Sequence, residues 1–361
     1  MERERWLRCV ELRSGDAVPC RVHISPAARR QHGRALAGVV RRYPAVEADL
    51  PESEDECAAL DAIHQKGNEF QDAWGCGWHN LQEGVIGQVC RPALADWQSL
   101  ADYEPPSPAV SGHFGPTDWE REERLIRSAQ TEGALTAGAV AHGFFFLRLC
   151  YLRGFENLMM DVASAEPRLD HLCDMVLDFN RGIVERYMAL GVDVMHFGDD
   201  LGMQRQLAIS PDAWRRYVKP AYAELFGMCR DAGTHVYLHS DGYIVDIMPD
   251  LIECGVTILN PQDLCNGLEA IRRELKGRIC IDLDVDRQRI TPRGTPQEVE
   301  AHVRRCIEVL GSPRGGLMLI WGLYPGVPLE NVEAVFRAMS ECRALHVAGE
   351  AQDRAGEETF S

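Results

Sequence analysis

The feature that most constrains the fold is an alternation of short apolar segments with longer segments of helical periodicity. Eight short segments are rich in β-branched and apolar residues, which is typical of strands. They span residues 18–24, 44–50, 134–141, 192–197, 234–239, 256–259, 278–283 and 316–320. Strands that alternate with helices form parallel sheets, because each parallel connection needs a long crossover. The sequence therefore predicts an α/β protein.

The segments between the strands carry signals of helix starts and ends. Apolar residues recur at steps of three and four from Leu169 to Leu190, which predicts a helix that ends at Gly191. Ser210-Pro211 and Thr295-Pro296 each place a capping hydroxyl before a proline, which predicts two further helix starts.

Eight strands that alternate with helices favour a closed (β/α)8 TIM barrel over an open doubly wound sheet. No Gly-x-Gly-x-x-Gly follows a predicted strand, so the phosphate-binding motif of dinucleotide folds is missing. Residues 68–110 are rich in Gly and Trp, and they predict an inserted hairpin and loop region of the kind that often covers a site. We expect one barrel over residues 1–345 and a polar, disordered tail over 346–361.

Charge and cysteine usage limit the possible binding partners and the cellular compartment. The net charge of −17 opposes binding to nucleic acid and to anionic membranes, so we expect neither partner. The 13 cysteines are scattered without a Cys-x-x-Cys pair, and no stretch resembles a secretory signal or a membrane span, which predicts a reduced cytoplasmic protein. Residues 1–42 hold ten arginines against four acidic residues, either as a solvated helix surface or to bind an acidic substrate.

Polar and aromatic residues follow the last five predicted strands. The carboxyl ends of barrel strands meet at one mouth, so we expect these side chains to lie there together. They are Asp199, Asp200 and Gln204 after the first of the five strands, His239 and Asp241 after the next, then Asn260 and Gln262, then Asp284 and Arg287, and finally Trp321.

Two pairs among these residues suggest chemistry. His239 and Asp241 can shuttle a proton or hold part of a metal site, although an isolated histidine more often bonds to a backbone carbonyl. Asp199 and Asp200 can share a site in which repulsion raises one pKa, or one of them can cap a helix. Arg287 either pairs with the neighbouring acids or binds a substrate carboxylate. Asp284 and its neighbours lack the Gly and distal Glu of a calcium loop, so we exclude calcium.

Several motifs in order resemble one known superfamily. Residues 143–342 resemble the superfamily of uroporphyrinogen decarboxylase and the cobalamin-dependent methyltransferases, which implies a (β/α)8 barrel. The motifs are Arg153-Gly154-Phe155-Glu156-Asn157, Phe197-Gly198-Asp199-Asp200-Leu201-Gly202, Ser210-Pro211 with Lys219-Pro220, Leu238-His239-Ser240-Asp241-Gly242, Leu259-Asn260-Pro261-Gln262 and Pro325-Gly326-Val327-Pro328-Leu329-Glu330-Asn331-Val332. Asp72-Ala73-Trp74-Gly75-Cys76 is similar to a hairpin motif of decarboxylase-like members, which adds Asp72 and Trp74 as substrate-binding candidates.

The resemblance to true uroporphyrinogen decarboxylases breaks at three places. The family's Arg-Gln-Ala-Gly-Arg-Tyr is only partly matched by residues 30–35, which lack the tyrosine. Its Phe-Ser-Asp-Ile-Leu has no counterpart, since Asp49 lies in a different context, and its late histidine is Trp321 here. These differences argue against the tetrapyrrole reaction.

The zinc methyltransferases of the superfamily use a His-x-Cys pair and a third cysteine near the last strand. His239 matches that histidine, Asp241 stands at the first cysteine position, and Trp321 or a neighbour stands at the second. The resemblance therefore implies His239 and Asp241 as ligands of a zinc ion, with the third ligand open, and a corrinoid protein as partner.

These observations lead to one main hypothesis and two alternatives. We expect an enzyme that acts on a small organic substrate, by methyltransferase-type, corrinoid-linked chemistry. The catalytic candidates are His239, Asp241 and Asp200, and the substrate-binding candidates are Asp199, Gln204, Asn260, Gln262, Asp284, Arg287, Trp321, Asp72 and Trp74. The alternatives are a cofactor-free uroporphyrinogen decarboxylase of porphyrin biosynthesis and a non-catalytic barrel that binds a ligand or a corrinoid protein. The sequence leaves the oligomeric state open.

Overall fold

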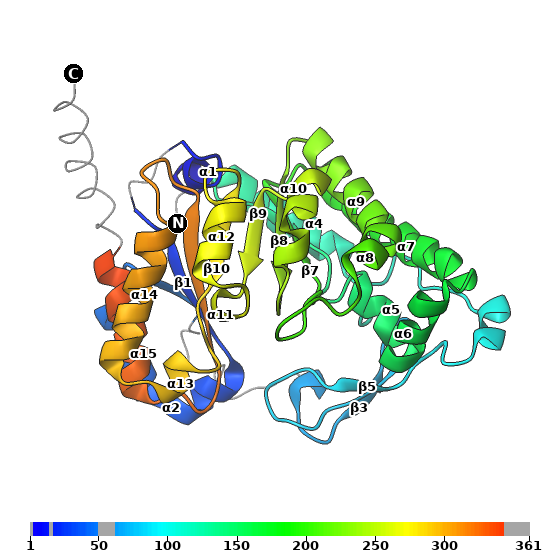
Figure 1. Cartoon of the computed structure of the whole chain (residues 1–361), viewed down its shortest axis with the longest axis horizontal. Helices are drawn as coiled ribbons and strands as arrows, with labels where there is room; N and C mark the ends of the chain where they lie inside the picture. Colours follow the sequence, from blue (N-terminus) through cyan, green and yellow to red (C-terminus); the bar gives the residue numbers. More distant parts are fainter. Residues whose placement is uncertain (1–2, 14–16, 50–61, 343–361) are drawn as a thin grey trace. The chain divides into compact units, whose positions relative to one another are not determined.

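The computed structural model describes residues 3–13, 17–49 and 62–342, and many of its helices and strands are labelled in Figure 1. The chain divides into two compact units. Unit 1 comprises residues 1–60 and 259–361, and unit 2 comprises residues 61–258. The predicted tail, 346–361, lies outside the described residues.

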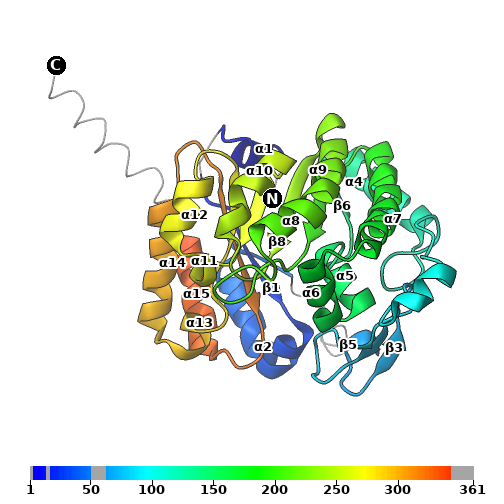
Figure 2. The same cartoon turned by 45° about the vertical axis from the view of Figure 1, so that its right-hand side comes forward.

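Unit 1 contains five of the parallel strands, in the order β2-β1-β11-β10-β9. Helices α14 and α15 lie side by side in both Figure 1 and Figure 2, and α2 packs against α15. The elements are α1 (Arg3–Val10), β1 (Cys20–Ile24), α2 (Pro26–Arg42), β2 (Glu47–Ala48), β9 (Ile258–Pro261), α11 (Asp263–Asn266), α12 (Leu268–Leu275), β10 (Cys280–Asp284), α13 (Ile290–Arg293), α14 (Pro296–Leu310), β11 (Leu317–Leu323) and α15 (Leu329–Cys342).

Unit 2 contains three parallel strands in the order β8-β7-β6 and a separate antiparallel sheet, β3-β4-β5. Helix α9 packs between α7 and α10, as Figure 2 shows. The elements are η1 (Ala62–His64), β3 (Glu69–Gln71), β4 (Gly77–His79), β5 (Gln88–Arg91), η2 (Trp97–Asp102), α4 (Trp119–Thr131), β6 (Ala137–Ala139), α5 (Phe146–Arg153), α6 (Phe155–Ser164), α7 (Arg168–Leu190), β7 (Val194–Gly198), α8 (Pro211–Tyr217), α9 (Lys219–Asp231), β8 (His235–Ser240), η3 (Val245–Ile247) and α10 (Met248–Cys254).

The eight predicted strands all occur, and the fold is α/β of the (β/α)8, TIM-barrel type. The strand predicted over residues 44–50 is reduced to the two residues of β2. The insertion over residues 68–110 is a three-stranded sheet instead of a simple hairpin, because the segment from Gln88 to Arg91 adds a strand beside β4. None of the described helices is long and apolar enough to span a membrane.

Local signals place the helices as the sequence predicts. The stripe in α7 is buried from Leu169 to Tyr187, and Gly191 ends the helix in the left-handed conformation with φ 68°. Ser210 caps α8 through its hydroxyl, and Thr295 and Glu298 form a reciprocal capping box at the start of α14. Capping and the apolar stripe together fix where each helix lies along the chain.

Candidate functional site

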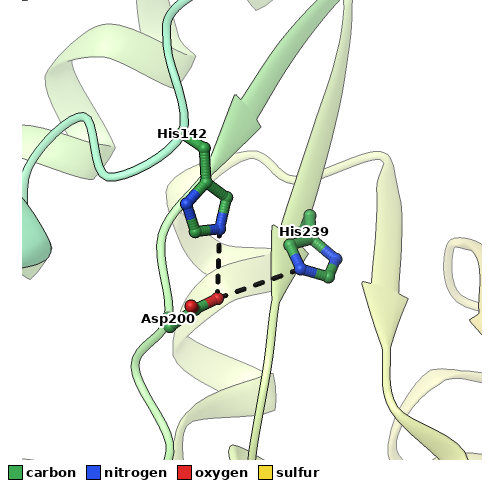
Figure 3. A group of neighbouring side chains, drawn as sticks. All are labelled: His142, Asp200 and His239. Carbon is green, nitrogen blue, oxygen red and sulfur yellow. Dashed lines mark hydrogen bonds and ion pairs between the residues drawn. The ribbon is translucent and has the colours of Figure 1, made fainter. Parts of the chain in front are cut away.

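Three side chains of unit 2 come together where three parallel strands end. His142 follows β6, Asp200 follows β7, and His239 lies on β8 near its carboxyl end. The strands pair in parallel, with Gly138 beside Met195, so their carboxyl ends lie side by side. Figure 3 shows both imidazoles directed at the Asp200 carboxylate.

The distances define a compact group. The His142 Nε2 atom lies 3.1 Å from Asp200 Oδ1, and the His239 Nε2 atom lies 3.8 Å from the same oxygen. Asp241 Oδ1 is 3.3 Å from His239 Nε2, and the Asp241 backbone N–H donates to Asp200 Oδ1 over 3.1 Å. We call His142, Asp200 and His239 the open cluster, because about half of the His142 side chain and about a quarter of the His239 side chain are exposed.

Glycines hold the loops of the open cluster close together. A Cβ atom on Gly202 would lie 2.4 Å from the backbone nitrogen of Tyr243, and one on Gly242 would lie 2.2 Å from the Gly202 carbonyl oxygen. Gly242 also has φ +81°, which disfavours other residues. The loops after β7 and β8 therefore touch through their backbones, which sets Asp200 and Asp241 near each other.

The electrostatics of Asp200 favour a carboxylate. Burial raises the pKa of Asp200, but the hydrogen bond and charge of His142, the charge of His239 and the Asp241 N–H together lower it below its ordinary value. The open cluster therefore presents an anion between two imidazoles.

Asp199 takes the helix-capping alternative that the sequence left open. Its side chain is fully buried, and it accepts hydrogen bonds from the backbone N–H groups of Phe146 and Leu147 and from the Tyr222 hydroxyl. Burial raises its pKa to about 6, against the lowering effect of these hydrogen bonds. The Asp199 carboxylate thus holds the first turn of α5, and substrate binding by Asp199 stays a prediction.

The sequence interpretation missed His142 and Tyr151. His142 is the first residue after the predicted strand 134–141, so the strand-end rule that selected His239 would also have selected His142. Tyr151 belongs to α5, and its hydroxyl would lie 3.3 Å from a Cβ atom on Gly143, the residue after His142. Burial and the charge of Asp199 raise the pKa of this phenol, so it stays a neutral hydrogen-bond donor.

The hairpin candidates Asp72 and Trp74 lie in the interior of unit 2. The Asp72 carboxylate accepts from the backbone N–H groups of Trp74 and Cys76, from Trp78 Nε1 and, over 2.6 Å, from Arg148 Nη1. Trp74 is 1% exposed. Both side chains are buried in this structure, and the Asp72 carboxylate pairs with Arg148, whereas substrate contact by either residue stays a prediction.

Gln204 lies at the exposed tip of the loop that closes through the Gly202–Leu207 bridge. The tip belongs to the same loop as Asp200, which begins where β7 ends. The prediction that Gln204 binds substrate stays a prediction.

In unit 1, the remaining candidates have internal partners. The Arg287 guanidinium lies 3.3 Å from Asp284 and donates to the Tyr324 hydroxyl over 3.3 Å, so it makes the internal pairing that was one of two alternatives. Asn260 donates to the Asp282 carbonyl. Trp321 is fully buried, and its indole N–H has no hydrogen-bond partner among the described residues, so substrate contact by Trp321 stays a prediction.

Gln262 has a similar internal setting. Its backbone carbonyl accepts from Asn266, and its side-chain oxygen accepts from the Cys265 thiol. Gln262 is 8% exposed. Substrate binding by Gln262, Asn260, Asp284 and Arg287 stays a prediction.

The donor set of the open cluster fits a divalent metal ion. Two imidazoles and one carboxylate are a common ligand set for zinc, and donor atoms in a tetrahedral zinc site lie about 3.3–3.6 Å apart. The pairs around Asp200 Oδ1 lie 3.1 and 3.8 Å apart, so small side-chain rotations would reach that spacing. The ligating atoms of His142, Asp200 and His239 all lie within 4.8 Å of one another.

Comparison with known proteins assigns the family. The family model for uroporphyrinogen decarboxylase (URO-D) matches residues 80–342, well over half of the chain. The chain belongs to the uroporphyrinogen decarboxylase family. Members of this family are enzymes, either decarboxylases or methyltransferases. A search of curated proteins gives no match.

One solved structure shares the fold. A methyltransferase from Methanosarcina mazei superimposes with a TM-score of 0.57 at 16% identity, over 90% of this chain and 94% of that chain. At this identity the likeness concerns the fold alone. A 3-keto-D-glucoside 4-epimerase from E. coli gives a TM-score of 0.38 at 15% identity, over 62% of this chain and 85% of that chain.

Proposed function

We propose that this family member is a metal-dependent enzyme that acts on a small organic substrate at the open cluster. The convergence of His142, Asp200 and His239 carries the proposal, because their ligating atoms lie within 4.8 Å of one another and imidazole nitrogen and carboxylate oxygen are zinc ligands. Zinc is the ion we infer first, since imidazole nitrogen and carboxylate oxygen suit it.

The chain's own residues have separate tasks in this proposal. His142, His239 and Asp200 hold the ion. Asp241 Oδ1 lies 3.3 Å from the same Nε2 atom of His239, so Asp241 is a further candidate ligand. Bound zinc would act as a Lewis acid that activates a substrate nucleophile. The Tyr151 hydroxyl stays protonated and donates a hydrogen bond to a substrate oxygen beside His142.

We infer methyl transfer linked to a corrinoid protein as the reaction, ahead of tetrapyrrole decarboxylation. A metal-binding donor set supports the methyltransferase branch, because uroporphyrinogen decarboxylation needs no metal. The Trp321 found in place of the decarboxylase histidine points the same way. A solved structure with the same fold is named as a methyltransferase, from Methanosarcina mazei, which also supports methyl transfer.

Elemental analysis of protein purified without chelator tests the metal. We expect a zinc equivalent that is lost in His142→Ala and in His239→Ala and retained in His171→Ala, an exposed histidine on α7. Equal metal content in all four proteins would contradict the open cluster as the metal site.

A reaction assay tests the chemistry. The protein is mixed with methylcobalamin and a panel of small thiols and phenols. Transfer of the methyl group to the acceptor releases the acceptor's proton and leaves cob(I)alamin, which is followed by its visible absorption. A parallel incubation with uroporphyrinogen is analysed for coproporphyrinogen. Formation of coproporphyrinogen without any methyl transfer would replace our proposal with decarboxylation.

A further inference from the structure

A second group of ligating side chains lies in unit 1. Asp263 begins α11, just after β9, and His302 and Cys306 lie on α14. Asp263 is 2% exposed, Cys306 is buried, and the His302 side chain is 11% exposed. We call these three residues the closed cluster, and its helices α11 and α14 are labelled in Figure 1.

The sequence of α14 explains why two of the three side chains share a direction. His302 and Cys306 are four positions apart, so they lie one above the other on one face of the helix. Val299 and Val303 are buried on neighbouring positions, so this face turns inward. The capping box at Thr295 fixes where α14 starts and therefore which residues face the interior.

The contacts of the closed cluster meet at one atom. The Asp263 Oδ2 atom lies 2.6 Å from His302 Nε2, and the Cys306 Sγ atom lies 3.8 Å from that same nitrogen. In a nucleophile, histidine and acid relay the two partners contact different ring nitrogens, so this arrangement is not such a relay. The oxygen, nitrogen and sulfur atoms lie within 4.8 Å of one another.

Metal binding at the closed cluster would release the proton of the Cys306 thiol, because the thiolate is the form that ligates a metal ion.

We propose that Asp263, His302 and Cys306 form a second metal site, which binds zinc or a similar divalent transition metal ion and stabilises unit 1. Thiolate and imidazole ligands exclude calcium and magnesium, which prefer oxygen ligands only. In a tetrahedral zinc site the sulfur and nitrogen ligands lie about 3.5 Å apart and nitrogen and oxygen about 3.3 Å apart. The Cys306 sulfur, at 3.8 Å, must approach His302 Nε2 by about 0.3 Å, and the Asp263 oxygen, at 2.6 Å, must move back by about 0.7 Å. A water molecule takes the fourth position.

The site would join three segments of unit 1. Asp263 Oδ2 accepts from the backbone N–H of Asp286 over 3.0 Å, and Asp286 follows β10. A metal ion on Asp263 therefore links the segment after β9, the segment after β10 and helix α14.

Cobalt(II) binding separates the closed cluster from the open cluster. The open cluster contains no thiolate, so a thiolate-to-cobalt charge-transfer band in the near ultraviolet reports on the closed cluster. The titration uses the His142→Ala/His239→Ala protein, in which the open cluster lacks both imidazoles. We expect one equivalent of cobalt with this band.

Two cysteine variants in the same background identify the ligand. Cys306→Ser should lose the band and the bound equivalent, whereas Cys229→Ser, a buried cysteine on α9, should keep both. Zinc should also raise the melting temperature of the double variant and leave that of the added Cys306→Ser variant unchanged.

X-ray absorption of the zinc-loaded double variant gives an answer even when Cys306→Ser does not fold. We expect one sulfur scatterer at about 2.3 Å from zinc, together with nitrogen or oxygen scatterers. A zinc environment without sulfur, or a cobalt band that persists in Cys306→Ser, would overturn the proposal and leave Asp263 and His302 as a hydrogen-bonded pair.

Discussion

The open and closed clusters contain similar residue types in opposite surroundings. His142, Asp200 and His239 lie at the ends of β6, β7 and β8, with a half-exposed imidazole and with the loops after β7 and β8 in close contact at Gly202 and Gly242. The closed cluster places Asp263, His302 and Cys306 in the interior, where the Asp263 carboxylate also binds backbone N–H groups. We infer that the open cluster, which solvent reaches, serves catalysis, and that the closed cluster, which is buried, stabilises the fold.

The backbone bonds of the two aspartates support this difference. Asp200 accepts one backbone N–H, from Asp241, and its other contacts are to imidazoles that a substrate or ion can share. Asp263 accepts from Leu264 and from Asp286, so its removal leaves buried donors without partners. Replacement of Asp200 should therefore lower activity, whereas replacement of Asp263 should lower the free energy of unfolding.

The largest effect is expected in the open cluster. His239→Ala and His142→Ala should each lower turnover by about 10²–10⁴-fold, because each removes a ligand or proton-transfer group, with little change in the free energy of unfolding. The measurement combines steady-state kinetics with urea denaturation, and His171→Ala serves as control. Loss of stability in parallel with activity would remove the distinction between the clusters.

The next effect concerns pH and Asp199, which neighbours Asp200 but is buried. Its pKa is raised to about 6 in the folded protein, above the value of about 3.9 in an unfolded chain. The folded state therefore binds this proton more tightly, and the Asp199 contribution to the free energy of unfolding is greatest below pH about 4. It falls as the pH rises through 6, by at most about 3 kcal/mol.

Asp199→Asn should remove this pH-dependent decrease in the free energy of unfolding. Its altered hydrogen bonds should also change the free energy of unfolding by an amount that does not depend on pH. The measurement is urea unfolding of the variant and the wild type across this pH range, with Asp231→Asn at the exposed end of α9 as control. Parallel curves for the Asp199 variant and the wild type would show that Asp199 is ionised throughout, like Asp200.

A third prediction tests the closed cluster. Asp263→Ala should lower the free energy of unfolding by about 2–3 kcal/mol, because it leaves the Leu264 and Asp286 N–H groups and His302 without an acceptor. Denaturation measured against Glu308→Ala, an exposed residue of α14, gives the comparison. A change below about 0.5 kcal/mol would mean that the closed cluster contributes no more than a surface position.

The smallest effect is expected from Gly198→Ala, which changes the open cluster without removing a ligand. The added Cβ atom would lie 2.8 Å from Cδ2 of His142, so the ring must shift. We expect about a tenfold loss of activity with the fold retained, whereas Gly227→Ala in α9, where nothing lies within 4 Å, should leave activity unchanged. Full activity of the Gly198→Ala variant would contradict the prediction that the position of the His142 ring matters for activity. A crystal structure of the variant would show whether the ring has moved.

The sequence predicts the strands and helix starts because these depend on local patterns. Periodicity places α7, and Ser210 and Thr295 place their helices, without knowledge of the rest of the chain. The inserted sheet was predicted only as a hairpin, because pairing of β5 with β4 depends on contacts that no local pattern specifies. Family membership also followed from motif order, and the family match over residues 80–342 confirms it.

The candidate site was predicted less completely, for a geometric reason. Asp199 and Asp200 look equivalent in sequence, yet successive side chains after a strand point in opposite directions, so Asp199 enters the core and Asp200 faces His142. Asp72 carries a motif but is buried against Arg148, since a motif does not reveal whether its carboxylate faces a ligand or another side chain. Burial is a property of the assembled fold.

The pairing of β1 with β11 has a consequence for folding during synthesis. One edge of β1 pairs with β2, which follows soon after it, but Cys20 also lies beside Leu319, so the other edge of β1 waits for a partner almost 300 residues later. At a translation rate of about 5–20 residues per second, that wait lasts about 15–60 s. Strands β7 and β8 lie about 40 residues apart and can pair early on the ribosome. The sheet of unit 1 is therefore completed after that of unit 2, and the edge of β1 that faces β11 is the segment that a chaperone would have to shield until then.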